Sequence, residues 1–231
     1  MNFAKKISII VPVGQSDESW RSLLSDLKPI RKSAEFIFCG PKALEFPEDW
    51  KNFSNVRFLR TPNGRARQMN FAAAQASRDV LWFLHADSKF TPDTLSSLKE
   101  LMKREIKGVH FFNLGFFDGP PWMVINTLGV WFRSHFLKLP FGDQGFLMEK
   151  SLFEKLGGFP ESAPFGEDHL LIWKAHELGS PVTPISGKLL TSARKYVSQG
   201  WLTTTCKHLY LTLTQSKQEL RRIVKVKKGI S

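Results

Sequence analysis

Short apolar runs alternate with helical patterns along the first hundred residues, and this alternation restricts the possible folds more than any other feature. The run ISIIVPV at 7–13 is nearly continuous and rich in β-branched residues, which is typical of a strand buried on both faces. Further strands are expected at 35–39, 56–59 and 79–84, and helices from about Asp17, over 65–77 and over 91–103. This order predicts an α/β domain with a mainly parallel central sheet flanked by helices.

The second half of the chain has a different pattern. An aromatic-rich strand is expected at 109–117, then a helix to about Leu137, and a turn at 141–145 that leads into another strand. Helical patterns follow at 150–160 and 165–179, then a strand near 182–190 and basic C-terminal helices. We expect this half to extend and cover the sheet, so that residues 1–231 form a single domain.

The formal net charge of +12 indicates an anionic partner. Basic residues are concentrated from Arg194 onward, where Glu219 is the only acid. Such a tail can simply be a solubilising face, or it can attract an anionic membrane, where each basic residue is worth about 1 kcal/mol. The sequence leaves both interpretations open. Nucleic acid is not an expected partner, because no helix-turn-helix, zinc-finger or RNA-recognition pattern accompanies the charge.

The cysteines and the hydropathy of the chain indicate the cellular compartment of the protein. Cys39 and Cys206 lie far apart, which fits a reducing environment better than a disulfide-linked secreted domain. The apolar segment at 119–132 is shorter than the roughly 20 residues that a membrane span needs, and it contains two prolines and two glycines. We therefore expect a cytoplasmic protein whose basic tail allows peripheral contact with the inner face of the cell membrane.

Polar residues follow the predicted strands, at the sheet edge where open α/β folds bind ligands. Pro12 to Asp17 follows the first strand, Cys39–Gly40 the second, TPNGRAR the third, and His85–Asp87 the fourth. Asp87 can be an ordinary turn residue, or it can bind Mg²⁺ or Mn²⁺, since one or two protein carboxylates suffice when the ion bridges a diphosphate. His85 can likewise be a ligand contact or a buried histidine with a satisfied hydrogen bond.

Three further segments carry candidate residues. Arg65 and Arg67 in GRAR open a helix, where the dipole disfavours cations, so a bound phosphate explains them better than helix stability does. Glu167 and Asp168 in GEDH either favour the helix dipole or provide a general base. The GDQG segment, with Asp143 and Gln144, is either a turn or a sugar contact.

Taken together, these segments resemble a family 2 glycosyltransferase of the GT-A type. The resemblance begins at ISIIVPV, continues through NGRARQMNFAAAQASRDVLWFLHADS, and includes FGDQG, LGGFPE, GEDHLL and TSARKY in the expected order. The chain is most similar to a small bacterial group with GRARQMN, LHAD and GDQG segments. The resemblance implies a GT-A (nucleotide-diphospho-sugar transferase) fold, with a nucleotide-binding half at 1–104, an acceptor and catalytic half at 105–193, and a basic helical tail at 194–231.

The resemblance also implies roles for individual residues. LHAD occupies the place of the family's DxD motif, so Asp87 would bind Mn²⁺ or Mg²⁺ on the donor diphosphate, and His85 replaces the first acid. Asp168 corresponds to the general base, and Asp143 is a second catalytic candidate. Gln144 and Glu167 would lie near the acceptor or the transferred sugar. Contacts with the nucleotide or its phosphates are implied for Pro12, Asp17, Arg65, Arg67, Asn70, His85 and Arg194.

The implied activity is inverting transfer of a sugar from a nucleotide-sugar donor, a UDP-sugar by default, to an acceptor that a lipid could carry. The chain departs from the family pattern at two places. Family members usually have an acidic residue after the second strand, but IFCGPKAL has none there. The usual Asn-Glu after the first strand is replaced by GQSDE, in which Asp17 or Glu18 can substitute. Two other functions remain open at this point. One is a nucleotidyl- or sugar-phosphate-transferring enzyme, and the other is a GT-A-like protein that binds without catalysis.

Overall fold

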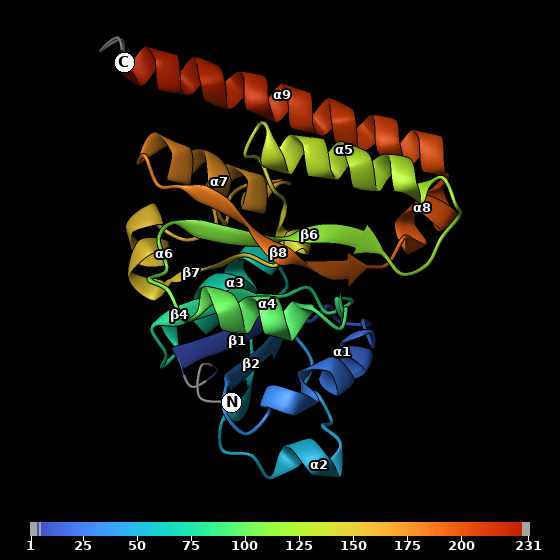
Figure 1. Ribbon diagram of the computed structural model, residues 1–231, viewed down its shortest axis with the longest axis vertical. Helices are drawn as coiled ribbons and strands as arrows, with labels where there is room; N and C mark the ends of the chain where they lie inside the picture. The colour runs from blue at the N-terminus through green and yellow to red at the C-terminus, as the bar shows by residue number, and fades with distance from the viewer. Residues whose placement is uncertain (1–3, 5, 228–231) are drawn as a thin grey trace.

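The computed structural model describes Ala4 and residues 6–227, with side chains described as far as Ile223. Within this part of the chain, eight strands form one sheet in the order β3-β2-β1-β4-β7-β6-β8-β5 (Figure 1). The strands are β1 (Ile7–Pro12), β2 (Glu35–Gly40), β3 (Val56–Arg60), β4 (Val80–Phe83), β5 (Lys89–Phe90), β6 (Val109–Phe116), β7 (Leu147–Glu149) and β8 (Val182–Thr191). The predicted α/β fold is confirmed.

Strand direction differs between the two halves of the sheet. β3, β2, β1 and β4 are parallel, as the sequence predicts. β7 then inserts antiparallel between β4 and β6, and β6 and β8 are parallel to each other. The short β5 is antiparallel to β8 and forms the edge of the sheet on that side. The second half therefore extends the sheet, as expected, but it does so through antiparallel pairing at β7.

Helices cover the sheet on both faces. They are α1 (Trp20–Leu27), α2 (Glu48–Lys51), α3 (Arg65–Ala74), α4 (Thr94–Leu101), α5 (Met123–His135), α6 (Lys150–Leu156), α7 (Glu167–Glu177), α8 (Arg194–Gln199) and α9 (Trp201–Lys227), with short 3₁₀ turns at Lys28–Ile30 and Gly142–Gln144. In Figure 1, α5 and α9 lie at the end of the molecule opposite α2. Within residue 4 and residues 6–227, no helix is long and apolar enough to cross a membrane.

Two predicted helix starts were wrong by a few residues. α1 begins at Trp20, because Asp17 accepts a hydrogen bond from the Ser19 amide in a turn that precedes the helix. α4 begins at Thr94, beyond the predicted Thr91. The Thr94 hydroxyl accepts from the Thr91 amide at 2.8 Å and donates to the Lys188 carbonyl at 2.6 Å, which ties this turn to β8.

The core consists of two apolar clusters, one on each face of the sheet. Successive side chains of a strand point to opposite faces. In β1, Ile9 and Val11 accordingly join the cluster under α1, while Ile10 joins the cluster under α3 and α7. All six residues of β1 are buried. Burial on both faces explains why ISIIVPV is a continuous apolar run and does not alternate.

Gly40 marks the end of β2 for a steric reason. Val13 donates to the Cys39 carbonyl at 2.8 Å, which brings the two chain segments together at the carboxyl edge of the sheet. A Cβ atom on Gly40 would lie 2.6 Å from the Val13 carbonyl oxygen. The Cys39–Gly40 step is therefore required for close packing of the chain after β1 and β2.

Candidate functional site

Two adjoining pockets lie at the carboxyl end of β1 and β4, and they share five lining residues. Pocket A has a volume of about 340 Å³ and lies between α7, α5, α8 and α9. Pocket B has a volume of about 280 Å³ and lies against the segments after β1 and before α3. The shared residues are Arg65, His85, Asp87, Arg194 and Lys195. Ligand binding at this edge is typical of open α/β sheets.

Pocket B collects the residues that were predicted after β1 and β4. Pro12, Asp17 and Asp87 line it, together with the turn that contains Asn63 and Gly64. Arg194 reaches back from α8 and lies 3.5 Å from the Asp17 carboxylate. The start of the basic tail therefore lines pocket B.

Asp87 lies in an environment that favours a cation. Burial raises the pKa of Asp87 above its usual value, Arg194 lowers it in part, and the charge of Asp17 raises it further. Two carboxylates in one pocket repel each other, and a divalent cation removes that repulsion. Over the described residues, no group of three or more His, Cys, Asp and Glu side chains could hold a metal alone. The residues present therefore fit Mg²⁺ or Mn²⁺ if diphosphate oxygens and water complete the coordination.

Arg65 stands at the centre of an ion-pair cluster. Its Nε donates to Glu167, and its Nη2 lies 3.7 Å from Asp168 Oδ2. Its Nη1 lies 3.0 Å from His85 Nε2. From the sequence, an arginine at the start of α3 indicated a bound phosphate. In the structure, the Glu167 and Asp168 carboxylates stabilise the Arg65 guanidinium at this position. Arg65 thus links α3 to α7 as well as lining both pockets.

His85 is held neutral in this cluster. Burial, and then the neighbouring Arg65 charge, lower the pKa of His85 to about 3. Because a guanidinium has no acceptor, Arg65 is the donor and His85 Nε2 is the acceptor. The neutral ring therefore carries its proton on Nδ1, and Nε2 helps to fix the Arg65 side chain.

Asp168 is an ionised carboxylate in the first turn of α7. Its Oδ2 accepts from the Gly142 amide at 2.6 Å, and its Oδ1 accepts from its neighbouring His169 amide at 2.9 Å. Burial alone would raise the pKa of Asp168, but Arg65 and these two amides hold it below its usual value. The GEDH helix start and the GDQG turn thus meet at one carboxylate, which lines pocket A.

Asp143 has the opposite character. Burial raises the pKa of Asp143 to about 6, while the nearby Arg133 guanidinium opposes the shift. Its Oδ1 is buried, and no partner for it lies among the described residues. Pocket A therefore contains two carboxylates of different basicity, Asp168 and Asp143.

Four predicted site residues do not line either pocket. Gln144 accepts from Ser134 Oγ at 2.8 Å and donates to the Phe112 carbonyl at 3.0 Å, so it stabilises the turn from inside. Glu167 faces Arg65. Arg67 lies 3.4 Å from Glu161, and Asn70 binds both backbone groups of Phe159 at 2.8 Å. The polar groups of these four residues have partners within the chain, and their ligand contacts stay predictions.

The structure adds site residues that no motif indicated. Arg133 comes from α5, donates to the Leu139 carbonyl at 2.8 Å, and lies 3.5 Å above the Phe141 ring. Lys195 and Tyr196 follow Arg194 into pocket A, and His208 reaches it from α9. The TSARKY segment was a usable signal for Lys195 and Tyr196. Nothing in the sequence around Arg133 or His208 distinguishes them from other helical residues.

Part of this sequence is similar to a known protein family. The sequence profile described as Glycosyl transferase family 2 matches residues 42–154. Over that range, which is just under half of the chain, the sequence is similar to family 2 glycosyltransferases. The matched range includes Arg65, Asp87 and Asp143 and ends before Asp168. Among proteins with curated descriptions, none is similar enough to match.

Solved structures support the same GT-A assignment at the level of the fold. TarS 1–349 from S. aureus superposes with a TM-score of 0.62 at 18% identity, over 81% of this chain and 60% of TarS; that protein has also been solved with UDP-GlcNAc. The mannosyltransferase PcManGT from Pyrobaculum calidifontis, solved with GDP-Man and Mn²⁺, gives 0.63 at 16% identity, over 92% of this chain and 64% of PcManGT. The chain therefore spans less than two thirds of these neighbours. These likenesses show that the chain has the GT-A fold, and residues 42–154 are similar in sequence to family 2 glycosyltransferases.

Proposed function

We propose that this protein transfers a sugar from a nucleoside-diphosphate sugar to an acceptor hydroxyl, with inversion and with a divalent metal on the diphosphate. The observation that carries this proposal is the joined pair of pockets, because Asp87 lies in the wall that they share and Asp168 lines pocket A alone. A donor diphosphate at the shared wall would place its sugar toward an ionised carboxylate. The nucleotide sugars bound by the structural neighbours support a donor of this class.

Pocket B would hold the nucleotide, with Pro12 and Asp17 on one side and Asp87 on the other. Arg194 and Lys195 would neutralise the diphosphate, and so would a metal held by Asp87, which supplies Lewis-acid stabilisation of the leaving group when bound. The division into a nucleotide-binding half at 1–104, an acceptor half at 105–193 and a basic tail at 194–231 belongs to this proposal, with Arg194 and Lys195 as contributions of the tail. A UDP-sugar is the default donor.

Pocket A would hold the acceptor, and Asp168 would take the proton from its hydroxyl. Asp168 is ionised, and its hydrogen bonds from Gly142 and His169 fix the carboxylate in place. Direct displacement needs such a base and no covalent nucleophile. Asp143, with its raised pKa and unpartnered Oδ1, would donate to or accept from a sugar hydroxyl beside Arg133.

Titration calorimetry with a panel of nucleoside diphosphates and Mn²⁺ tests the donor side. We expect one nucleotide to bind, and Asp87→Ala to remove the metal-dependent part of its affinity, because that carboxylate would hold the ion. Asp168→Asn should retain nucleotide binding and lose turnover by about 10²–10⁴-fold, as for a missing general base. Binding of none of the nucleotides would refute the enzyme function and favour a non-catalytic GT-A-like protein.

Analysis of the reaction products distinguishes glycosyl transfer from nucleotidyl or sugar-phosphate transfer. Release of a nucleoside diphosphate supports glycosyl transfer, whereas release of pyrophosphate would identify a nucleotidyl- or sugar-phosphate-transferring enzyme. Unchanged turnover in Asp168→Asn would exclude Asp168 as the base. In that case Asp143→Asn is the variant to examine, because Asp143 is the other carboxylate of pocket A.

A further inference from the structure

Helices α5 and α9 present large apolar side chains to solvent. On α5, Leu128 is 61% exposed, and four neighbours are also exposed: Val124, Ile125, Trp131 and Phe132. Phe136, directly after this helix, is 63% exposed. On α9, the exposed apolar residues include Leu202, Leu209, Tyr210 and Leu213. We call these ten residues the α5–α9 surface. Soluble monomers rarely expose so many large apolar side chains close together, and such patches mark interaction sites.

Charge around the α5–α9 surface has one sign. Residues 119–141 and 193–218 contain no Asp or Glu, but they include Lys138, Lys207 and Lys217. Lys207 and Lys217 are exposed on α9. The next acid along α9, Glu219, pairs with Arg222 at 2.8 Å. The apolar side chains are therefore accompanied by unopposed positive charge.

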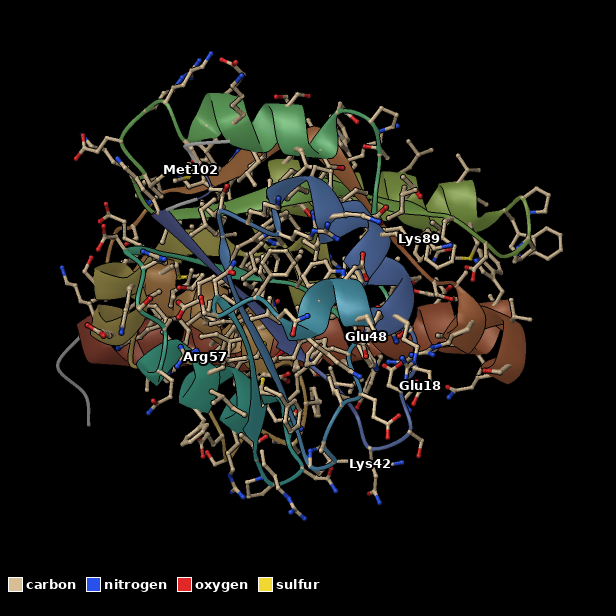
Figure 2. All side chains as sticks on the ribbon, turned by 90° about the horizontal axis from the view of Figure 1, so that it is seen from below. Glu18, Lys42, Glu48, Arg57, Lys89 and Met102 are labelled. Atoms are coloured by element: carbon tan, nitrogen blue, oxygen red, sulfur yellow. The ribbon has the colours of Figure 1, made fainter. Side chains whose placement is uncertain are left out.

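The opposite end of the molecule is different. Figure 2 looks at that end, where Glu18, Lys42 and Glu48 are labelled. Its charges have both signs and pair locally: Arg21 lies 2.6 Å from Glu18, and Lys51 lies 2.6 Å from Glu48. The α5–α9 surface therefore differs from the end of the molecule near α2, and Figure 1 shows α5 and α9 at the opposite end.

We propose that the α5–α9 surface docks on an anionic lipid membrane. Interfacial helices bury one apolar face at the boundary of headgroups and acyl chains, and basic residues beside that face attract anionic lipids. Trp131 and Tyr210 suit this boundary, because each has an apolar ring and a polar group that can remain hydrated. Pairing of two copies through this surface is less favoured, because it would bring together two surfaces of the same positive charge.

Pocket A lies directly beneath the proposed docking surface. Val130 and Arg133 of α5 and Leu211 and Thr212 of α9 line pocket A, so the two helices of the docking surface also enclose that pocket. Docking would hold pocket A next to the lipid headgroups. The inference does not rest on the proposed glycosyl transfer, because membrane binding is measured without donor or acceptor.

Vesicle co-sedimentation of the full chain tests the proposal. We expect binding to phosphatidylcholine vesicles that contain phosphatidylglycerol, weaker binding to phosphatidylcholine alone, and weakening by added NaCl. The double variant Leu128→Gln/Phe132→Gln should lower partition about tenfold or more, because two large apolar side chains no longer enter the lipid. The double variant Lys207→Gln/Lys217→Gln should reduce the vesicle binding that added NaCl weakens. It should leave the binding that persists at high NaCl unchanged.

Phe71→Gln is the matched control, since Phe71 is 46% exposed on α3, outside the α5–α9 surface. It should bind vesicles like the unmodified protein, and all variants should show the same thermal unfolding. Absence of vesicle binding, or equal losses in Phe71→Gln and Leu128→Gln/Phe132→Gln, would overturn the proposal. So would a dimer in light scattering that Leu128→Gln/Phe132→Gln converts to a monomer, because a second copy would then cover this surface.

Discussion

Gly142 approaches the candidate base so closely that one methyl group would disturb it. A Cβ atom there would lie 3.0 Å from Asp168 Oδ2 and 3.2 Å from His85 Nε2. We predict that Gly142→Ala lowers turnover about tenfold or more by displacing Asp168, since misplaced catalytic groups lose much of their effect. Kinetics on the identified donor measure this.

Gly129→Ala is the matched control for Gly142→Ala. Gly129 lies in the exposed part of α5, where an added Cβ meets nothing within 4 Å. Alanine should raise stability there by up to about 1 kcal/mol through helix propensity and leave turnover unchanged. Full activity in Gly142→Ala would show that the base tolerates displacement, or that another group performs its role.

Glu35 supplies a pH-dependent contribution to stability. It accepts from Ser8 Oγ, from the Ser77 amide at 2.8 Å and from Arg57 Nη2 at 2.7 Å. Burial alone would raise the pKa of Glu35, but these donors hold it below its usual value of 4.5. The carboxylate therefore stabilises the fold above pH 4.5, and this contribution is lost as the pH falls through the lowered pKa.

We predict that Glu35→Gln lowers the free energy of unfolding by about 1–3 kcal/mol at pH 7, because buried donors lose a charged acceptor. The difference from the unmodified protein should shrink below pH 4.5 in denaturant titrations at several pH values. Glu48→Gln is the control: it removes an exposed pair with Lys51, worth at most about 1 kcal/mol. A pH-independent difference would contradict the role of the Glu35 charge.

At the scale of elements, α3 is joined to the loop before α7 by a side chain that the sequence associated with the nucleotide. Asn70 binds the amide and the carbonyl of Phe159, and both groups would lose their partner in Asn70→Ala. We predict a loss of about 1–3 kcal/mol in the free energy of unfolding, with nucleotide affinity unchanged. Thermal unfolding and calorimetry measure the two quantities.

Arg67→Ala serves as the comparison, because Arg67 was predicted for the same role and pairs only at the surface with Glu161. It should cost less than about 1 kcal/mol and also spare nucleotide affinity. A substantial loss of nucleotide binding in either variant would support the role that the sequence resemblance implied.

Element types were largely predictable because local patterns determine them. The continuous run in β1 and the apolar stripe of α1 predicted buried elements, and both are buried. The pairing of Arg65 with Glu167 was not predictable, since each residue has a sufficient local explanation and only the fold brings them together. Arg133 was missed for the same reason: its environment comes from Asp143 and Phe141, which belong to the turn after α5.

At the scale of the whole molecule, the resemblance predicted which segments gather at one edge of the sheet, and the pockets contain Asp17, Arg65, His85, Asp87, Asp143, Asp168 and Arg194. It could not show which of their polar groups already have partners inside the chain. Gln144 illustrates this limit, because its contacts with Ser134 and Phe112 come from other elements. Motif order thus predicted which segments gather at the pockets, whereas only the tertiary structure shows which of their side chains also have partners within the chain.

The antiparallel insertion of β7 has a consequence for how the chain can be divided. β7 pairs with β4 on one side and β6 on the other, although it comes long after β4 in the sequence. Until residues 147–149 have been synthesised and docked, β4 is an open sheet edge that can pair with another chain. A fragment that ends at residue 104 would keep that edge permanently. Residues 1–104 are thus not a detachable module, because β4 depends on a segment that comes much later in the chain.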